Sequence, residues 1–240
     1  MLQNLKIDKS AMQEPTDRVG LLSTGLYTNC VIKYAYIIDA ESGAKGVVIK
    51  FDVITDADTG AKRELTQTLW VSNKDGQTFY IDQRTNKPHN LMGFNMANHI
   101  CALGAGKSLI EMDTEVKNIP IYDFDTKKEV LKPMPVLHEL TGCSVALAIA
   151  RVKQNKQVKN PQTGKYEPTD EPQELNQIEK VFSMKTGTPL TYDESFKGSQ
   201  EGTFAVNWAT KFTDTIIDKF KPVTVVSNKG SAAKRLGGIN

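Results

Sequence analysis

Hydrophobic and polar positions alternate along residues 27–71 in a way that predicts consecutive β-strands. β-Branched and aromatic side chains fill many of the hydrophobic positions, as is typical of strands. Turns at residues 41–46 and 56–60, which contain glycine together with serine or aspartate, separate the segments. The predicted strands are residues 27–39, 47–55 and 65–71. We therefore expect an antiparallel meander in this part of the chain.

Another turn signal and a helix follow the meander. Residues 72–76 contain Asp-Gly, which accepts positive φ in a hairpin turn, and they predict a further strand over residues 78–81. Residues 94–103 carry apolar side chains at helical spacing, with Gly104 as the stop signal. A helix inserted among the strands of a meander is typical of the five-stranded OB barrel, where it plugs the open end.

The second half of the chain predicts a long hairpin. Residues 144–153 alternate as a strand, with Val145, Leu147 and Ile149 on one face. Residues 177–182 are the predicted returning strand, so a long cationic arm lies between the two. The hairpin is expected to extend beyond the barrel as a clamp over a bound strand, and a solvated arm without a binding role is the alternative.

Two other segments are less regular. Residues 116–140 contain three prolines and predict loops and edge strands. Residues 204–220 predict an amphipathic helix that packs against the barrel, because large apolar side chains recur at every fourth position. These side chains are Trp208, Phe212, Ile216 and Phe220.

Together these patterns predict a mainly β fold with a few helices. The specific expectation is an OB-fold-like five-stranded barrel with an extended β-hairpin arm and a C-terminal helix. The predicted parts are a polar leader (1–22), an OB-fold domain with the inserted helix and the long basic hairpin (23–185), a C-terminal helical extension (186–226) and a flexible basic tail (227–240).

Charge is unevenly distributed along a chain whose formal net charge is only +2. Residues 151–165 carry five cations and no acid, and residues 211–240 carry six cations and two acids. Such blocks can create a basic face on a nearly neutral protein. With 240 residues and 39% hydrophobic content, the chain is long and apolar enough to bury a core.

The sequence gives no sign of secretion, membrane insertion or a disulfide framework. Cys30, Cys101 and Cys143 are far apart and form no CxxC or Cys/His motif, which predicts three small buried thiols and no zinc site. The N-terminus lacks a signal-peptide pattern, and no run of 18 apolar residues occurs. We expect a cytoplasmic protein, in the host cell if it is encoded by a phage.

No catalytic constellation stands out, so we expect a non-enzymatic protein without cofactor or metal. The stretch Gly104-Ala105-Gly106-Lys107 suggests a P-loop, but Cys101 occupies the position of its first glycine and a helix precedes it. The interpretation we favour is a helix end followed by a turn, with Lys107 as a candidate phosphate contact. The three histidines are isolated from one another and from metal-ligand partners.

Aromatic and cationic side chains of the meander are the candidates for nucleic-acid binding. Tyr34 and Tyr36 share a face, flanked by Ile32 and Ile38, while Lys33 is expected on the opposite face. Trp70 alternates with polar residues, which makes it the best stacking candidate. The alternative is that the tyrosines belong to the edge of the core. The full candidate set is Lys33, Tyr34, Tyr36, Lys50, Arg63, Trp70, Phe79, Tyr80, Lys107, Arg151, Lys153, Lys156 and Lys159.

In the order of these features the chain resembles the OB-fold single-stranded DNA-binding proteins of bacteriophages. The likeness spans roughly residues 20–185 and rests on several short matches. These are Gly25-Leu26-Tyr27, Tyr34-Ala35-Tyr36 leading into residues 41–47, the turn at residues 73–76 with Tyr80, residues 91–95 opening a helix, and residues 140–143 before the strand and its lysine-rich hairpin. One departure is the C-terminus, which is basic where many such proteins end in an acidic tail.

The resemblance implies a protein that coats and protects exposed single strands during phage DNA replication or recombination. Single-stranded DNA is the expected partner, with replication or recombination proteins as further candidates. Stacked bases and paired phosphates should make binding independent of base sequence and steeply sensitive to salt. Two alternatives stay open: a phage structural or protein-interaction β-barrel module, and an accessory protein that anneals strands during recombination. The sequence leaves the oligomeric state open.

Overall fold

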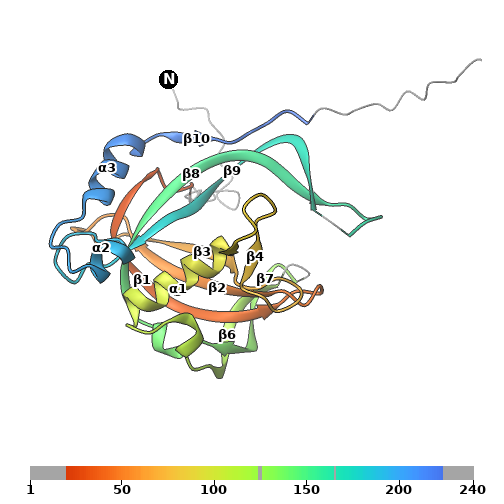
Figure 1. Cartoon of the computed structure of the whole chain (residues 1–240), viewed down its shortest axis with the longest axis horizontal. Helices are drawn as coiled ribbons and strands as arrows, with labels where there is room; N and C mark the ends of the chain where they lie inside the picture. The colour runs from red at the N-terminus through yellow and green to blue at the C-terminus, as the bar shows by residue number, and fades with distance from the viewer. Residues whose placement is uncertain (1–19, 124–125, 165, 224–240) are drawn as a thin grey trace, which may run out of the picture. The chain divides into compact units, whose positions relative to one another are not determined.

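The computed structural model describes residues 20–123, 126–164 and 166–223 of the chain (Figure 1). The chain divides into two compact units, Met1–Arg151 with Asn176–Ile216 and Val152–Leu175 with Ile217–Asn240. The first unit holds the main sheet and the helices. The predicted basic tail (227–240) and most of the predicted leader (1–22) lie outside the described residues.

The predicted three-stranded meander is confirmed. Strands β1 (Gly25–Asp39), β2 (Lys45–Ile54) and β3 (Lys62–Trp70) pair antiparallel in chain order. Their inner face is apolar and buried, because β-branched and aromatic residues alternate with polar ones along each strand. Ile32, Phe51 and Leu65 form one buried row of cross-strand neighbours, and in the next row Ala35 and Ile49 are buried while Gln67 is partly exposed.

The strand predicted after the meander does not extend it. Strand β4 (Phe79–Ile81) pairs with β5 (Pro88–Asn90) in a separate two-stranded sheet. The outer edge of β3 is occupied at Trp70, because Gly93 lies so close that a Cβ on it would stand 2.2 Å from the Trp70 carbonyl oxygen. The chain therefore covers this edge with the start of a helix.

That helix, α1 (Met92–Gly104), matches the predicted segment. Its buried residues, Ala97, Ile100, Cys101 and Leu103, face the main core. The glycines that suggested a P-loop close the helix instead, since the helix ends at Gly104 and Gly106 takes a positive φ of 76°.

The proline-containing segment forms a well-ordered hairpin. Strands β6 (Glu115–Asp123) and β7 (Lys128–Val136) pair along their whole length, and β7 meets β1 through the pair Tyr36–Val136. Beyond that junction the hairpin leaves the plane of the main sheet (Figure 1). Its prolines are tolerated because each of these strands has little or no pairing on its other side.

Strand β8 (Ser144–Lys159) pairs with β1 and with β9 (Tyr166–Phe182), and within the first unit it is buried on both faces. Val145, Leu147 and Ile149 point into the main core, as predicted. On the other face, the small side chains of Ala146 and Ala148 accommodate a helix.

That helix is α3 (Thr203–Phe212), which follows the short helix α2 (Tyr192–Phe196). Trp208 is buried against the alanines of β8 and packs on Phe212 with ring centroids 5.5 Å apart, so the predicted packing role holds for these two residues, whereas Ile216 lies outside the helix and is exposed. The predicted helix over residues 204–220 is too long. The β-branched run after Phe212 ends the helix, Asp214 takes a positive φ of 59°, and Ile216–Asp218 forms strand β10.

The chain is mainly β and antiparallel, as predicted, but in the described residues the sheet does not close into a barrel. Its order is β10–β8–β1–β2–β3, with β9 paired to β8. Side chains connect β9 to β3 and also to the segment that precedes β1. The Ile178 amide donates to Gln67 Oε1 at 3.5 Å, and the Asn176 side chain exchanges two hydrogen bonds with the Leu22 backbone. The predicted five-stranded OB barrel is therefore not confirmed.

Candidate nucleic-acid interface

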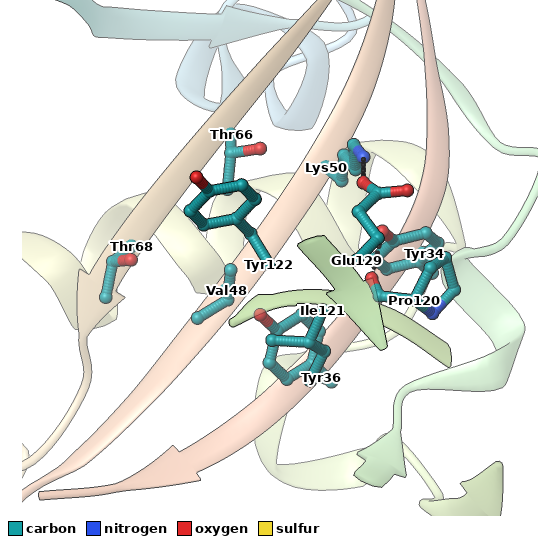
Figure 2. A pocket seen from close by; sticks show the side chains of 10 residues that line it. All are labelled: Tyr34, Tyr36, Val48, Lys50, Thr66, Thr68, Pro120, Ile121, Tyr122 and Glu129. Atoms are coloured by element: carbon teal, nitrogen blue, oxygen red, sulfur yellow. Dashed lines mark hydrogen bonds and ion pairs between the residues drawn. The ribbon is translucent and has the colours of Figure 1, made fainter. Parts of the chain in front are cut away.

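A groove of about 300 Å³ lies on the outer face of the meander, beneath the β6–β7 hairpin (Figure 2). The sheet supplies its floor and the hairpin its roof. The lining residues are Tyr34, Tyr36, Val48, Lys50, Thr66, Thr68, Pro120, Ile121, Tyr122 and Glu129. Aromatic, hydroxyl and cationic groups thus meet in one depression of the surface.

Strand register explains why the floor has this composition. Residues directly opposite one another in antiparallel strands point to the same face, so the floor consists of rows across three strands. The two rows that line the groove are Tyr34–Lys50–Thr66 and Tyr36–Val48–Thr68, and the row Ile38–Gly46–Trp70 continues the same face of the sheet beyond it. Successive rows are two residues apart, which is roughly 6.8 Å along a strand.

A β-bulge shapes one end of the groove. The register of β1 against β2 shifts between Ile32 and Tyr34, so Lys33 is an extra residue. The prediction that Lys33 points away from the tyrosines is therefore wrong, since its ammonium contacts Glu64, the same carboxylate that Lys50 contacts. Ile32 is on the buried face and does not flank the tyrosines, because the bulge reverses the alternation.

Both tyrosines are partly buried on the outer face and stand outside the buried core clusters. Their ring centroids are 6.2 Å apart with planes inclined by 40°. The Tyr34 hydroxyl donates to the Pro120 carbonyl oxygen at 3.0 Å, which ties the hairpin to the sheet. Burial raises the pKa of Tyr36, so this phenol stays neutral at physiological pH.

Lys50 is the cation among the groove-lining residues. Its Nζ lies 2.9 Å from Glu64 Oε2, 3.3 Å from Glu129 Oε1 and 5.8 Å from the centre of the Tyr34 ring. Burial lowers its pKa, but the hydrogen bonds to the two glutamates and the nearby Tyr34 outweigh that effect and the net pKa is raised. Lys50 is therefore fully charged at neutral pH.

Carboxylates balance the lysines at this end of the groove. The hydrogen bond from Lys33 lowers the pKa of Glu64, and Lys62 Nζ lies 2.7 Å from Asp52 Oδ2. Lys33, Lys50 and Lys62 thus face Asp52, Glu64 and Glu129, for a local net charge of zero. A phosphate at Lys50 would have to compete with carboxylates that are already bound.

Trp70 extends the floor by one row and is 46% exposed. Its position depends on two glycines. A Cβ on Gly46 would stand 3.1 Å from the indole ring, and Gly93 packs against the Trp70 backbone. The prediction that Trp70 lies on the outer face of its strand is confirmed, and its use in binding stays a prediction.

The structure separates other candidate residues of the first unit from the groove. Arg63 lies on the opposite face of β3 from Thr66 and donates to the Gly20 carbonyl oxygen at 2.6 Å. Phe79 and Tyr80 belong to the β4–β5 hairpin, and Tyr80 is exposed. The Tyr80 ring stacks on His89, with ring centroids 5.9 Å apart. Lys107, another candidate of the first unit, forms an ion pair with Glu139.

The remaining candidates lie on the long hairpin. Arg151 is a partly buried residue of β8 at the end of the first unit. In the second unit, Lys153 Nζ is 3.4 Å from Asp218 Oδ2, Lys156 Nζ is 2.8 Å from Glu171 Oε2, and Lys159 is exposed. The paired lysines make this arm less cationic than the sequence of β8 alone indicates.

Sequence reasoning missed the roof of the groove. Tyr122 and Glu129 are direct partners in the β6–β7 ladder and line the groove together. The alternation of Pro120 and Tyr122 was an available signal for a strand, but the prolines of this segment led us to predict loops and edge strands. Thr66 and Thr68 could have been found, because they share a face with Trp70.

Comparisons of the chain with known protein families, with curated proteins and with solved structures find no match. Across the described residues, no group of three or more histidine, cysteine, aspartate or glutamate side chains could hold a metal ion. In the same residues, no helix is both long and apolar enough to cross a membrane. The functional argument therefore rests on the groove itself.

Proposed function

We propose that this protein binds single-stranded DNA, independently of base sequence and without catalysis, in the groove between the meander and the β6–β7 hairpin. The observation that carries the proposal is the row arrangement of the floor. Tyr34 and Tyr36 stand in adjacent rows, with threonine hydroxyls and Lys50 beside them. Such a surface offers ring faces to bases and polar groups to the sugar–phosphate chain.

The resemblance to bacteriophage OB-fold proteins supports a wider role. A meander with a helix over its edge and a second long hairpin is compatible with an opened relative of the OB arrangement. On this proposal the protein coats and protects single strands in phage DNA replication or recombination. It works in the cytoplasm of the host cell.

A protein-interaction module is the second candidate, and one observation favours it. Several cations proposed to contact phosphate are engaged by carboxylates in the structure, including Lys50, Lys107 and Lys156. Large apolar side chains are also exposed in the first unit, notably Met92 at 85% and Phe196 at 82%. These features suit a protein partner as well as a nucleic acid.

Fluorescence anisotropy with labelled dT oligomers tests the proposal directly. The full chain is titrated at 50 and 200 mM salt, with duplex DNA of equal length as competitor. We expect binding that weakens with salt and that the duplex fails to displace. A strand-annealing assay then distinguishes a coating protein from an annealing protein.

Variants of the floor connect the result to the groove. Tyr36→Ala should weaken dT binding, because a stacked base contributes roughly 1–3 kcal/mol. Tyr80→Ala is the matched control, since it removes an exposed tyrosine that does not line the groove. No binding at 50 mM salt would refute the proposal and favour pull-down experiments for a protein partner.

A further inference from the structure

The Lys50–Glu129 contact joins the floor of the groove to its roof. Lys50 lies in the middle strand of the meander, and Glu129 lies on β7 directly opposite Tyr122. Both residues line the groove, and the dashed line in Figure 2 marks their contact. The Glu129 carboxylate therefore contacts one side of the Lys50 ammonium.

We propose that Glu129 acts as an internal competitor for Lys50, a carboxylate that single-stranded DNA must displace before a phosphate can pair with this lysine. The inference rests on the proposed function, since it assigns a regulatory role within the same groove. It predicts that the chain binds single-stranded DNA more weakly than it would if the Glu129 carboxylate did not pair with Lys50.

Distances and exposure single out Glu129 among the carboxylates near Lys50. Glu64 is held by two lysines, at 2.9 Å from Lys50 and in closer contact with Lys33. Glu129 lies farther from Lys50, at 3.3 Å, and its side chain is 55% exposed. Exposed ion pairs contribute little to stability, so Glu129 is the carboxylate whose displacement costs least.

Lys50 itself is suited to the exchange. Its side chain is only 13% exposed and stays charged beside Glu64, so the ammonium is held in place when Glu129 leaves. A phosphate that replaced Glu129 would lie beside the Tyr34 row and one row from Tyr36. A neighbouring base could then reach the Tyr36 ring, because the rows are roughly 6.8 Å apart.

The test compares dT affinity of the wild-type chain and Glu129→Gln at 50 mM salt. The substitution keeps the size of the side chain and removes the charge that competes with phosphate. We expect Glu129→Gln to bind about threefold to fivefold more tightly, as removal of one exposed ion-pair partner allows.

Two further variants separate this mechanism from a general effect of charge. Glu115→Gln removes an equal charge from the same hairpin, but Glu115 pairs with Lys117 at 2.9 Å and does not line the groove. Its affinity should match the wild type within about twofold. Lys50→Met removes the contested ammonium, so adding Glu129→Gln to it should give no further gain.

The outcomes distinguish this inference from the proposed function. Failure of the wild-type chain to bind dT refutes the proposed function, and the inference with it. Wild-type binding that Glu129→Gln leaves unchanged or weakens refutes the inference alone. An equal gain from Glu115→Gln, or a gain that persists with Lys50→Met, also refutes it, because the effect would then not pass through Lys50. Urea unfolding confirms that each variant is folded.

Discussion

Glu194 connects two helices through one carboxylate, and its removal should destabilise the fold in a pH-dependent way. Glu194 Oε2 accepts hydrogen bonds from the Thr191 amide at 2.8 Å and the Thr191 hydroxyl at 2.9 Å, at the start of α2. Its Oε1 accepts from the Thr203 hydroxyl and the Phe204 amide, both at 3.1 Å, at the start of α3. The carboxylate thus satisfies backbone donors that helices leave unpaired at their N-termini.

The expected magnitude follows from the pKa of this group. Burial alone would raise the pKa of Glu194, but the hydrogen bonds to both helix starts outweigh burial and lower it to about 2 from an ordinary value of 4.5. At about 1.4 kcal/mol per pKa unit this shift corresponds to roughly 3 kcal/mol. Because the side chain is partly exposed, we discount the contribution to about 2 kcal/mol.

The sign of the pH dependence is fixed by the direction of the shift. A carboxyl whose pKa is lower in the folded state stabilises the fold fully above its unfolded pKa of about 4.5 and loses that contribution as the pH falls toward 2. Glu194→Gln should therefore lower the free energy of unfolding by about 2 kcal/mol at pH 7. Near pH 2 the difference from wild type should be small.

Urea unfolding followed by tryptophan fluorescence measures this effect, since Trp208 belongs to α3 and is buried where that helix packs against β8. Glu201→Gln is the control, because Glu201 is an exposed acid just before the same helix. A destabilisation by Glu194→Gln that is equal at pH 7 and pH 2.5 would show that side-chain shape, and not charge, is what matters. A variant as stable as wild type at pH 7 would refute the capping role altogether.

Three shorter predictions test other features. Gly93→Ala should lower the free energy of unfolding by about 1–3 kcal/mol, because the added Cβ would collide with the Trp70 backbone. Gly25→Ala is the control in the same unfolding experiment and should be tolerated, because its Cβ would meet only a Tyr27 ring carbon at 3.7 Å. In native protein at pH 8, a thiol reagent should modify Cys143 well before the two buried cysteines, whose pKa values burial raises to about 12; equal rates at all three would contradict the burial pattern. Trp70→Ala should weaken dT binding about 5- to 150-fold and remove any fluorescence quenching by dT, and unchanged affinity would exclude Trp70 from the site.

The sequence was informative where one local period dominates. β-Branched and aromatic content between glycine-containing turns predicted β1 to β3, and helical spacing predicted α1, because these signals are local in the sequence. The extent of α3 was overestimated, because Ile216 and Phe220 continue the apolar spacing after Thr213 and Asp214 have already ended the helix. The spacing of apolar residues along the sequence does not show that the backbone changes from helix to strand between two of them.

The groove was only half predictable, for a physical reason. Its floor follows from strand alternation, apart from the bulge at Lys33, which reverses the faces by one residue. Its roof comes from a hairpin about 85 residues away in the chain, tied down by the Tyr34–Pro120 hydrogen bond. Alternation of Pro120 and Tyr122 indicates a strand, but no local pattern places that strand over the meander, so Tyr122 and Glu129 could not be assigned to the site from sequence.

Charge pairing in the groove changes the salt dependence that the sequence led us to expect. For single strands the slope of log K against log salt is about −0.7 for each phosphate neutralised. If Lys50 and one neighbouring lysine are the only contacts, affinity should fall about sevenfold between 50 and 200 mM salt. Six contacts would give a fall of about 300-fold. A shallow slope with tight binding would therefore assign the affinity to the stacked rings of the groove, and a steep one would assign it to lysines outside the groove.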